Sequence, residues 1–335
     1  MARTAFVTGS SGFIGFHLCK RFLADGFSVV GLDAMTPYYD VALKRQRLAL
    51  LQQSPAFRQQ EARLEDPGCL AAILAEARPQ VIVHLAAQAG VRHSIDAPRT
   101  YVESNLVGTF ELLEAARAHP PAHLLMASTS SVYGANKAMP YAETDKADLQ
   151  MSFYAATKKA TEAMAHSYAH LYRIPTTMFR FFTVYGPWGR PDMAPIKFAR
   201  AILAGEPIDI YNYGDMRRDF TFIDDLIEAI RRLIEVPPLP PATRPAGDSL
   251  SPVAPFRIVN IGNGAPVALM DFIAALEQAL GVKAVKNFLP MQPGDVPATW
   301  ADTTLLQSLV GLLQQTDIAD GVRRFVAWHR SQVSR

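Results

Sequence analysis

The sequence predicts an α/β fold in which a doubly wound parallel sheet carries a smaller C-terminal α/β lobe. Short apolar runs alternate with amphipathic helical patterns through the first half of the chain, as in strands joined by right-handed helical crossovers. A glycine-rich turn follows the first apolar run and opens the first helical pattern. The chain has 335 residues, which is enough for a large core and two lobes.

Short apolar runs are interpreted as buried strands. In order, these strands cover residues 4–8, 27–33, 81–85, 123–128, 176–182 and 256–260. Helices are expected where apolar residues recur every three or four positions. In order, they cover residues 13–24, 67–77, 100–119, 152–172 and 224–235.

This order of elements predicts two domains. The sheet domain comprises residues 1–180 with roughly 219–262, and the smaller lobe comprises residues 181–218 and 263–335. Seven prolines fall between residues 237 and 255, where apolar residues show no periodicity. We interpret that segment as an exposed surface loop.

Composition argues against several classes of function. The net charge of +2 gives no reason to expect nucleic acid or membrane partners. Cys19 and Cys69 are the only cysteines and no Cys/His spacing of a metal site occurs, so no metal is expected. The N-terminus leads directly into a strand, and no apolar run is long enough to span a bilayer. We therefore expect a cytoplasmic protein.

The turn after the first strand has the spacing G-x-x-G-x-x-G. Small residues let the backbone approach a pyrophosphate, and the N-terminus of the following helix attracts its charge. The next strand ends at Asp33, whose carboxylate can bond both ribose hydroxyls and repels a 2′-phosphate. The alternative is a glycine-rich turn without a ligand. We predict that NAD binds at Gly9, Ser11, Gly12, Phe13, Ile14, Gly15 and Asp33.

Two further segments bear on the cofactor and the chemistry. Another strand closes with small residues, which would let its backbone lie close to the cofactor at Leu85, Ala86, Ala87 and Gln88.

Tyr154 and Lys158 are four residues apart on one predicted helix face. A Lys beside a Tyr favours the phenolate, so the phenol can act as a base near neutral pH. The pair predicts a nicotinamide enzyme that takes a proton from an alcohol, although such a pair also occurs by chance.

These residues resemble the extended short-chain dehydrogenase/reductase family, with its Rossmann sheet, and within it the nucleotide-sugar epimerase branch. The resemblance covers nearly the whole chain, and residues 182–193 are closely similar to the UDP-glucuronate 4-epimerases. Other shared motifs are Asn105 with Gly108-Thr109, and residues 128–134, 180–187, 218–225 and 293–297.

The resemblance implies interconversion of UDP-glucuronate and UDP-galacturonate. Tyr154 would take the proton of the sugar 4-hydroxyl, Thr129 would share a hydrogen bond with that hydroxyl, and Lys158 would hold the nicotinamide ribose and lower the Tyr154 pKa. Hydride would pass from C4 to NAD, and the 4-keto sugar would turn over and receive it on the other face. Asn105 is a further implied cofactor residue, as is Leu64, because Arg63 replaces the adenine-binding Asp of many relatives.

The positions after Thr129 separate reaction types within the family. The 4,6-dehydratases carry an Asp-Glu pair there and the decarboxylases a Glu at the second position, whereas this chain has Ser130 and Ser131. Oxidation at C4 of glucuronate creates a β-keto acid, so an epimerase must hold the carboxylate in an unreactive orientation. We expect that role for Thr129, Ser130, Ser131, Thr183 and Arg190, with Arg190 supplying a charge-assisted contact.

The resemblance also implies contacts for the rest of a UDP-sugar. Arg218 would bind the diphosphate, Asp295 the uridine ribose and Tyr211 the uracil. Arg92 would line the sugar pocket, and Lys197 would assist with the nucleotide. The predicted helices 100–119 and 152–172 would pack two subunits into a homodimer through a four-helix bundle.

Three other functions stay open at this stage. A 4-epimerase of neutral or N-acetylated UDP-hexoses would use the same catalytic residues. A UDP-glucuronate decarboxylase is disfavoured by Ser131. An NAD-binding regulatory protein on the same scaffold is disfavoured because Thr129, Tyr154 and Lys158 are all present.

Overall fold

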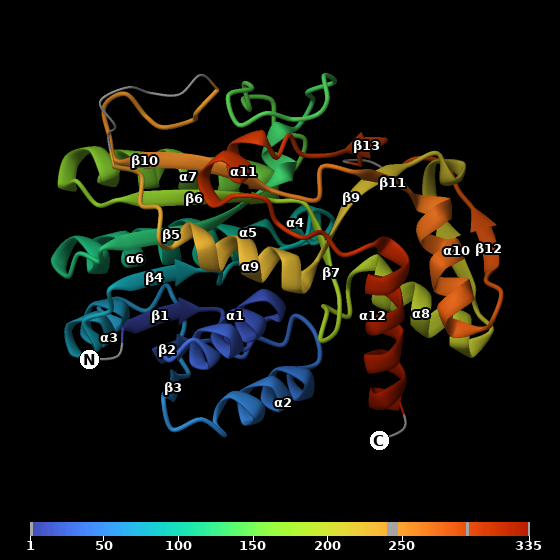
Figure 1. Cartoon of the computed structure of the whole chain (residues 1–335), viewed down its shortest axis with the longest axis horizontal. Helices are drawn as coiled ribbons and strands as arrows, with labels where there is room; N and C mark the ends of the chain where they lie inside the picture. Colours follow the sequence, from blue (N-terminus) through green and yellow to red (C-terminus); the bar gives the residue numbers. More distant parts are fainter. Residues whose placement is uncertain (1–2, 240–246, 293–294, 334–335) are drawn as a thin grey trace.

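The computed structural model describes residues 3–239, 247–292 and 295–333. It confirms the predicted fold class, because a seven-stranded parallel sheet lies between two layers of helices (Figure 1). The strand order is β10-β6-β5-β4-β1-β2-β3. The strands are β1 (Thr4–Thr8), β2 (Ser28–Leu32), β3 (Phe57–Gln60), β4 (Val81–His84), β5 (His123–Thr129), β6 (Thr176–Phe181) and β10 (Phe256–Ile261).

Alternate residues of each strand supply the two faces of the sheet. Ala5 and Val7 of β1 belong to one apolar cluster, which includes helices α1 (Phe13–Ala24) and α9 (Ile223–Leu233). Phe6, between them, belongs to a second cluster on the opposite face. That cluster includes α3 (Cys69–Ala77), α6 (Gly108–Ala118) and α7 (Phe153–Tyr172). Each fully buried apolar side chain contributes roughly 1.5–3 kcal/mol.

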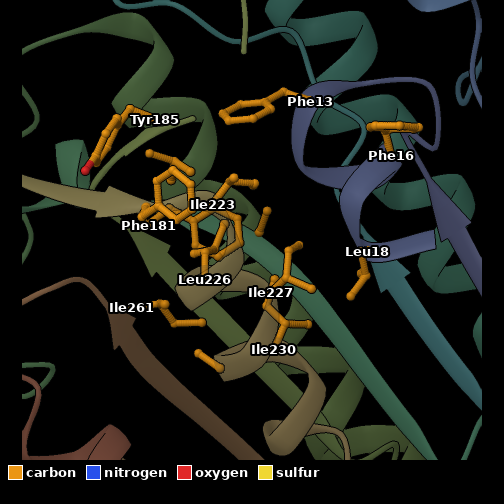
Figure 2. Close-up of a cluster of buried hydrophobic side chains, with 14 of the residues drawn as sticks. Phe13, Phe16, Leu18, Phe181, Tyr185, Ile223, Leu226, Ile227, Ile230 and Ile261 are labelled. Carbon is orange, nitrogen blue, oxygen red and sulfur yellow. The ribbon is translucent and has the colours of Figure 1, made fainter. Parts of the chain in front are cut away.

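Figure 2 shows how α1 and α9 share the first of these clusters. Phe13, Phe16 and Leu18 of α1 lie near the α9 residues Ile223, Leu226, Ile227 and Ile230. The α9 sequence also matches its helix dipole, since Asp224 and Asp225 lie in its first turn and Arg231 and Arg232 in its last.

The smaller lobe lies beside the sheet domain, on the right in Figure 1. Its four-stranded sheet contains β7 (Thr183–Tyr185), β9 (Arg217–Phe222), β11 (Pro266–Ala268) and β13 (Ala298–Thr299), and β8 (Pro207–Ile210) pairs with β12 (Val285–Phe288). Its helices are α8 (Ala194–Ala204), α10 (Leu269–Leu280) and α12 (Ile318–Val333). A short helix, α11 (Thr304–Val310), packs against α9 and β10.

Several elements differ from the sequence-based expectation. Helix α2 (Val41–Leu51) and the edge strand β3 were not predicted, because charged residues occupy buried positions of α2 and β3 is mostly polar. The expected helix 100–119 is interrupted: α5 (Pro98–Tyr101) leads into a π-helix, η1 (Val102–Val107), before α6 begins. A short α4 (His93–Asp96) precedes them, and 3₁₀ turns η2 (Ser130–Tyr133) and η3 (Tyr211–Gly214) complete the elements.

The predicted proline-rich loop falls partly outside the described residues, because 240–246 are among those not described. Its described flanks contain neither helix nor strand. They are not wholly exposed as predicted, because Asp248, Leu250 and Ala254 are buried. Within the described ranges, every helix is too short or too polar to cross a lipid bilayer. In the same ranges, His, Cys, Asp and Glu side chains form no group of three or more that could hold a metal ion.

Candidate active site

One cleft of about 1020 Å³ collects nearly all of the predicted site residues. It runs over the carboxyl ends of β1, β4, β5 and β6 and continues between the two lobes. Ligands bind at this position in open parallel sheets, where the strand order reverses beside β1. Of the residues singled out from the sequence, Ser11 and Asn105 are not in its lining, while all the others are.

The glycine turn fits a dinucleotide. Gly9 has a φ of +72°, and a Cβ there would lie 2.9 Å from the amide nitrogen of Ala86. A Cβ on Gly15 would lie 2.0 Å from the Gly9 carbonyl oxygen, so both positions require glycine. The N-terminus of α1 receives no side-chain cap in the described structure, which leaves its first amides available to an anion.

Asp33 lies at the end of β2 with its carboxylate held in place. Oδ2 accepts a hydrogen bond from the Ser11 amide at 3.2 Å, and Oδ1 accepts one from the Met35 amide at 2.9 Å. Ser11 therefore supports the site through its backbone, while its hydroxyl donates to Gln59 at 3.1 Å. Lys44 Nζ lies 3.7 Å from Oδ1 and also lines the cleft. The sequence offered little signal for Lys44, because α2 was not recognised as a helix.

Tyr154 and Lys158 lie one turn apart near the start of α7, and both face the cleft. Burial raises the pKa of Tyr154, whereas the positive charge of Arg190 and the Thr129 hydroxyl lower it. Arg190 is therefore a cation that favours the phenolate of Tyr154, and the same contribution from Lys158 stays a prediction. Burial lowers the pKa of Lys158 to about 8, and the charge of Glu162, one turn further along, raises it.

Asn105 takes part in the architecture around the site. Its Oδ1 accepts a hydrogen bond from the Gln88 amide at 2.8 Å, and its Nδ2 donates to the Gln88 carbonyl at 3.1 Å and to Thr157 Oγ1 at 3.0 Å. It therefore ties the segment after β4 to α7, between Tyr154 and Lys158. The π-helix η1 carries this residue, and π-helical turns occur frequently at functional sites.

The residues expected around a sugar carboxylate converge beside Tyr154. Thr129 ends β5 and donates to Ser131 Oγ at 3.2 Å, and Ser130 opens the turn η2. Arg190 donates to both oxygens of Asp192, from Nε at 3.1 Å and from Nη2 at 2.5 Å. Asp192 was not singled out from the sequence. Its position two residues after Arg190 was the available signal, and the structure shows that it holds the guanidinium.

Two of the residues expected at the nucleotide end, Asp295 and Tyr211, contact Arg92, which was expected to line the sugar pocket. Arg92 Nη2 lies 3.2 Å from Asp295 Oδ2, and its guanidinium lies 4.9 Å from the centre of the Tyr211 ring. Arg218 donates to the carbonyls of Val296 at 2.8 Å and Pro297 at 3.1 Å. Lys197 also lines this part of the cleft. At the other end of the cleft, Arg63 is paired with Glu65.

Known proteins of one family are similar to this chain over most of its length. Residues 5–242 match the model of the NAD dependent epimerase/dehydratase family. A probable UDP-glucuronate 4-epimerase of Rhizobium meliloti (strain 1021) is 56% identical over 332 residues, which cover 98% of this chain and 97% of that protein. UDP-glucuronate 4-epimerase 4 of Arabidopsis thaliana is 43% identical over 99% of this chain and 76% of its own length.

A solved structure is similar along the whole chain. It is the UDP-glucuronic acid 4-epimerase from Bacillus cereus in complex with UDP-glucuronic acid and NAD. The match has a TM-score of 0.87 and 31% sequence identity, and it covers 98% of this chain and 99% of that chain.

Proposed function

Because the chain belongs to the NAD-dependent epimerase/dehydratase family, we propose that it is a UDP-glucuronate 4-epimerase, which interconverts UDP-glucuronate and UDP-galacturonate. One observation carries the proposal: the Tyr154–Lys158 pair shares a cleft with Ser130, Ser131 and Arg190. The pair suits oxidation of a sugar alcohol, and the other three residues suit an acidic sugar.

The sheet domain would bind the cofactor, and the smaller lobe would complete the UDP-sugar site. The glycine turn, Asp33, residues 85–88 and Lys158 are the groups that would hold NAD. When bound, NAD supplies an acceptor and a donor of hydride for C4 of the sugar. Retention of the cofactor through the cycle would make an external oxidant unnecessary.

Tyr154 would remove the proton from the sugar 4-hydroxyl and return it at the end of the cycle. Thr129 lies at the end of β5 within the same cleft, and its hydroxyl would share a hydrogen bond with the reacting oxygen. The charges of Lys158 and Arg190 would favour the phenolate, opposing the burial that raises the pKa of Tyr154.

The carboxylate would be restrained by hydroxyl groups and a guanidinium. A β-keto acid loses CO₂ most readily when its carboxylate is perpendicular to the ketone plane, so fixed hydrogen bonds can suppress that loss. Thr129, Ser130, Ser131 and Thr183 would supply hydroxyls, and Arg190 would supply charge. Neither residue 130 nor 131 is a carboxylate, which disfavours the dehydratase and decarboxylase reactions.

A specific observation favours the second candidate, a 4-epimerase of neutral UDP-hexoses. Asp192 already accepts both hydrogen bonds that Arg190 presents in fork geometry, so the local charge is balanced without a substrate carboxylate. An acidic sugar would have to share Arg190 with Asp192. Comparing turnover of UDP-glucuronate and UDP-glucose separates the two candidates.

We also propose that the chain forms a homodimer through the helices around α6 and α7. Phe110 of α6 is 46% exposed and Leu171 of α7 is 62% exposed, and Val107 at the end of η1 is 40% exposed. Apolar side chains exposed on neighbouring helices are typical of a buried interface. Sedimentation equilibrium at micromolar concentration tests this assembly.

Proton NMR of the purified protein with UDP-glucuronate and no added NAD tests the function. The proposal predicts that UDP-galacturonate appears. Release of CO₂ with a UDP-pentose or its 4-keto form would contradict the proposed restraint of the carboxylate. If only UDP-glucose and UDP-galactose interconvert, the second candidate is correct.

A further inference from the structure

Arg47 lies on α2 and is completely buried, with an exposed fraction of 0%. Its Nη1 donates to the Ser11 carbonyl at 3.0 Å and to the Tyr39 hydroxyl at 2.9 Å. Its Nη2 donates to the carbonyls of Trp188 at 2.6 Å and Gly189 at 3.2 Å. One guanidinium therefore joins the glycine turn to the backbone that immediately precedes Arg190.

We propose that Arg47 is a positioning residue, which holds the backbone at 188–189 against the glycine turn and thereby fixes Arg190 for the sugar carboxylate. This inference rests on the proposed function. Arg47 would not touch the substrate itself. It would act through Arg190, which directly follows Trp188 and Gly189, two of the residues whose carbonyls accept hydrogen bonds from Arg47.

The backbone that Arg47 holds is strained. Trp188 has a φ of +60°, and a bulky residue seldom adopts this left-handed conformation. Such strain persists only where the surroundings enforce it, and it often occurs at functional sites. Several contacts hold Trp188 in this conformation, and the hydrogen bonds from Arg47 of α2 are among them.

Two other helices hold the same segment. The Trp188 ring packs against Phe16 of α1 and Trp328 of α12, with ring centres 5.5 and 5.6 Å apart respectively. His17 Nε2 lies 3.0 Å from the Pro187 carbonyl oxygen. Helices α1, α2 and α12 therefore converge on the residues before Arg190, which argues that the position of Arg190 is specified and not incidental.

The chemistry of the residue fits this task. The planar guanidinium presents donors on two sides in a fixed geometry, so it can join two backbone segments at once. Hydrogen bonds from a charged donor are stronger than neutral ones. A buried charge is costly unless it is satisfied. Four hydrogen bonds to carbonyl and hydroxyl oxygens satisfy the two terminal nitrogens of Arg47, while its Nε has no partner among the described residues.

Binding of two nucleotide sugars tests the proposal. The dissociation constants of UDP-glucuronate and UDP-glucose are measured by calorimetry on NAD-loaded protein, and their ratio reports recognition of the carboxylate. The variants are Arg47→Met, Arg190→Met and the double variant. We expect Arg47→Met to reduce the preference for the acidic sugar about 10-fold, while the affinity for UDP is unchanged. The double variant should show no loss beyond that of Arg190→Met.

Arg45→Met is the matched control. Arg45 lies on the same helix, but it is exposed and paired with Glu61, so this change should leave the ratio as in the wild type. Arg47→Lys keeps the positive charge but loses the forked guanidinium, so its ratio of the two dissociation constants should lie between those of the wild type and Arg47→Met. If Arg47→Met does not fold, the same ratio measured on Arg47→Lys tests the proposal.

Three results would overturn the proposal. The ratio could be unchanged in the Arg47 variants, both sugars could lose affinity equally, or the losses from Arg47 and Arg190 could add. Failure of the proposed function is recognised separately, because the wild-type protein would then neither prefer nor epimerise UDP-glucuronate.

Discussion

The cofactor half and the substrate half of the cleft are built by different means. Around the glycine turn, backbone segments lie too close together for a side chain. A Cβ on Gly15 would lie 2.0 Å from the Gly9 carbonyl oxygen. In the substrate half, long side chains already hold internal partners, as Arg190 holds Asp192 and Arg92 holds Asp295. The first half is preorganised, whereas we propose that the second exchanges contacts when a UDP-sugar binds.

This difference has an energetic consequence. A preorganised site loses little entropy and breaks few contacts on binding, which suits a cofactor that is retained. In the substrate half, Arg190 and Arg92 would have to break or share their ion pairs with Asp192 and Asp295. Breaking these pairs would weaken binding, which suits a substrate whose product must be released. Four substitutions test this difference between the two halves.

The largest effect is expected for Gly15→Ala, which tests the backbone-dependent half. The added methyl would collide with the Gly9 carbonyl, so purified protein should contain essentially no NAD by chromatography of the extracted nucleotide. Gly26→Ala is the control, because a Cβ on Gly26 would meet nothing within 4 Å, even though Gly26 has a positive φ and Gly15 does not. Normal NAD content in Gly15→Ala would break the comparison.

Tyr154→Phe removes the proposed base at the boundary of the two halves. Turnover should fall on the order of 10³-fold, because general base catalysis is lost, while NAD content and UDP-glucuronate affinity are retained. Tyr172→Phe, at the end of the same helix, is the control. A turnover within a few-fold of the wild type would remove Tyr154 from this role.

Asp192→Asn addresses the exchange of partners in the substrate half. Without the competing charge, Arg190 should be freer to bind a carboxylate, so the affinity for UDP-glucuronate should rise roughly 3- to 10-fold relative to UDP-glucose. Titration calorimetry measures both values. A fall in that relative affinity would mean that Asp192 orients Arg190 productively and does not compete for it.

Glu143 lies outside the cleft lining and accepts a hydrogen bond from the Asn260 amide, and its substitution should give the smallest effect. Burial raises its pKa to about 7, so the folded state binds a proton between pH 4.5 and 7 that the unfolded state has released. Stability therefore falls as pH rises through this window. Glu143→Gln removes the titration and should stabilise the protein at pH 8, by roughly 1–3 kcal/mol, with less effect at pH 4.5.

Thermal midpoints at pH 8 and pH 4.5 measure this difference. The amide oxygen of Gln can still accept the hydrogen bond that Glu143 receives from the Asn260 amide at 2.8 Å. A greater gain at pH 4.5 than at pH 8 would contradict the assigned direction of the pKa.

The sequence predicted the sheet more fully than the contacts within the site. Buried strands such as β1 and the helix α1 matched the expected bounds, because local apolar patterns specify them. Helix α2 was missed because Lys44 and Arg47 are buried in it, contrary to the usual exposure of charged residues. The roles of these two residues depend on distant partners, at β2 and at residues 188–189.

The motifs located the candidate residues, but they did not predict which side chains pair with one another. The contact of Arg92 with Tyr211 and Asp295 depends on how the two lobes meet, whereas Arg190 and Asp192 pair within one segment of the smaller lobe. Asn105 was predicted at the cofactor, and in the structure its side chain joins Gln88 to Thr157. The contacts of Arg92 and Asn105 are tertiary, and local patterns carry little information about them.

We propose that C4 of the sugar is oxidised and reduced within one cleft, without release of the intermediate. UDP-glucuronate labelled with deuterium at C4, incubated with the protein and no added nucleotide, tests this proposal. We expect the UDP-galacturonate that forms to retain deuterium at C4. Loss of the label to solvent, or a product that carries hydrogen at C4, would contradict it.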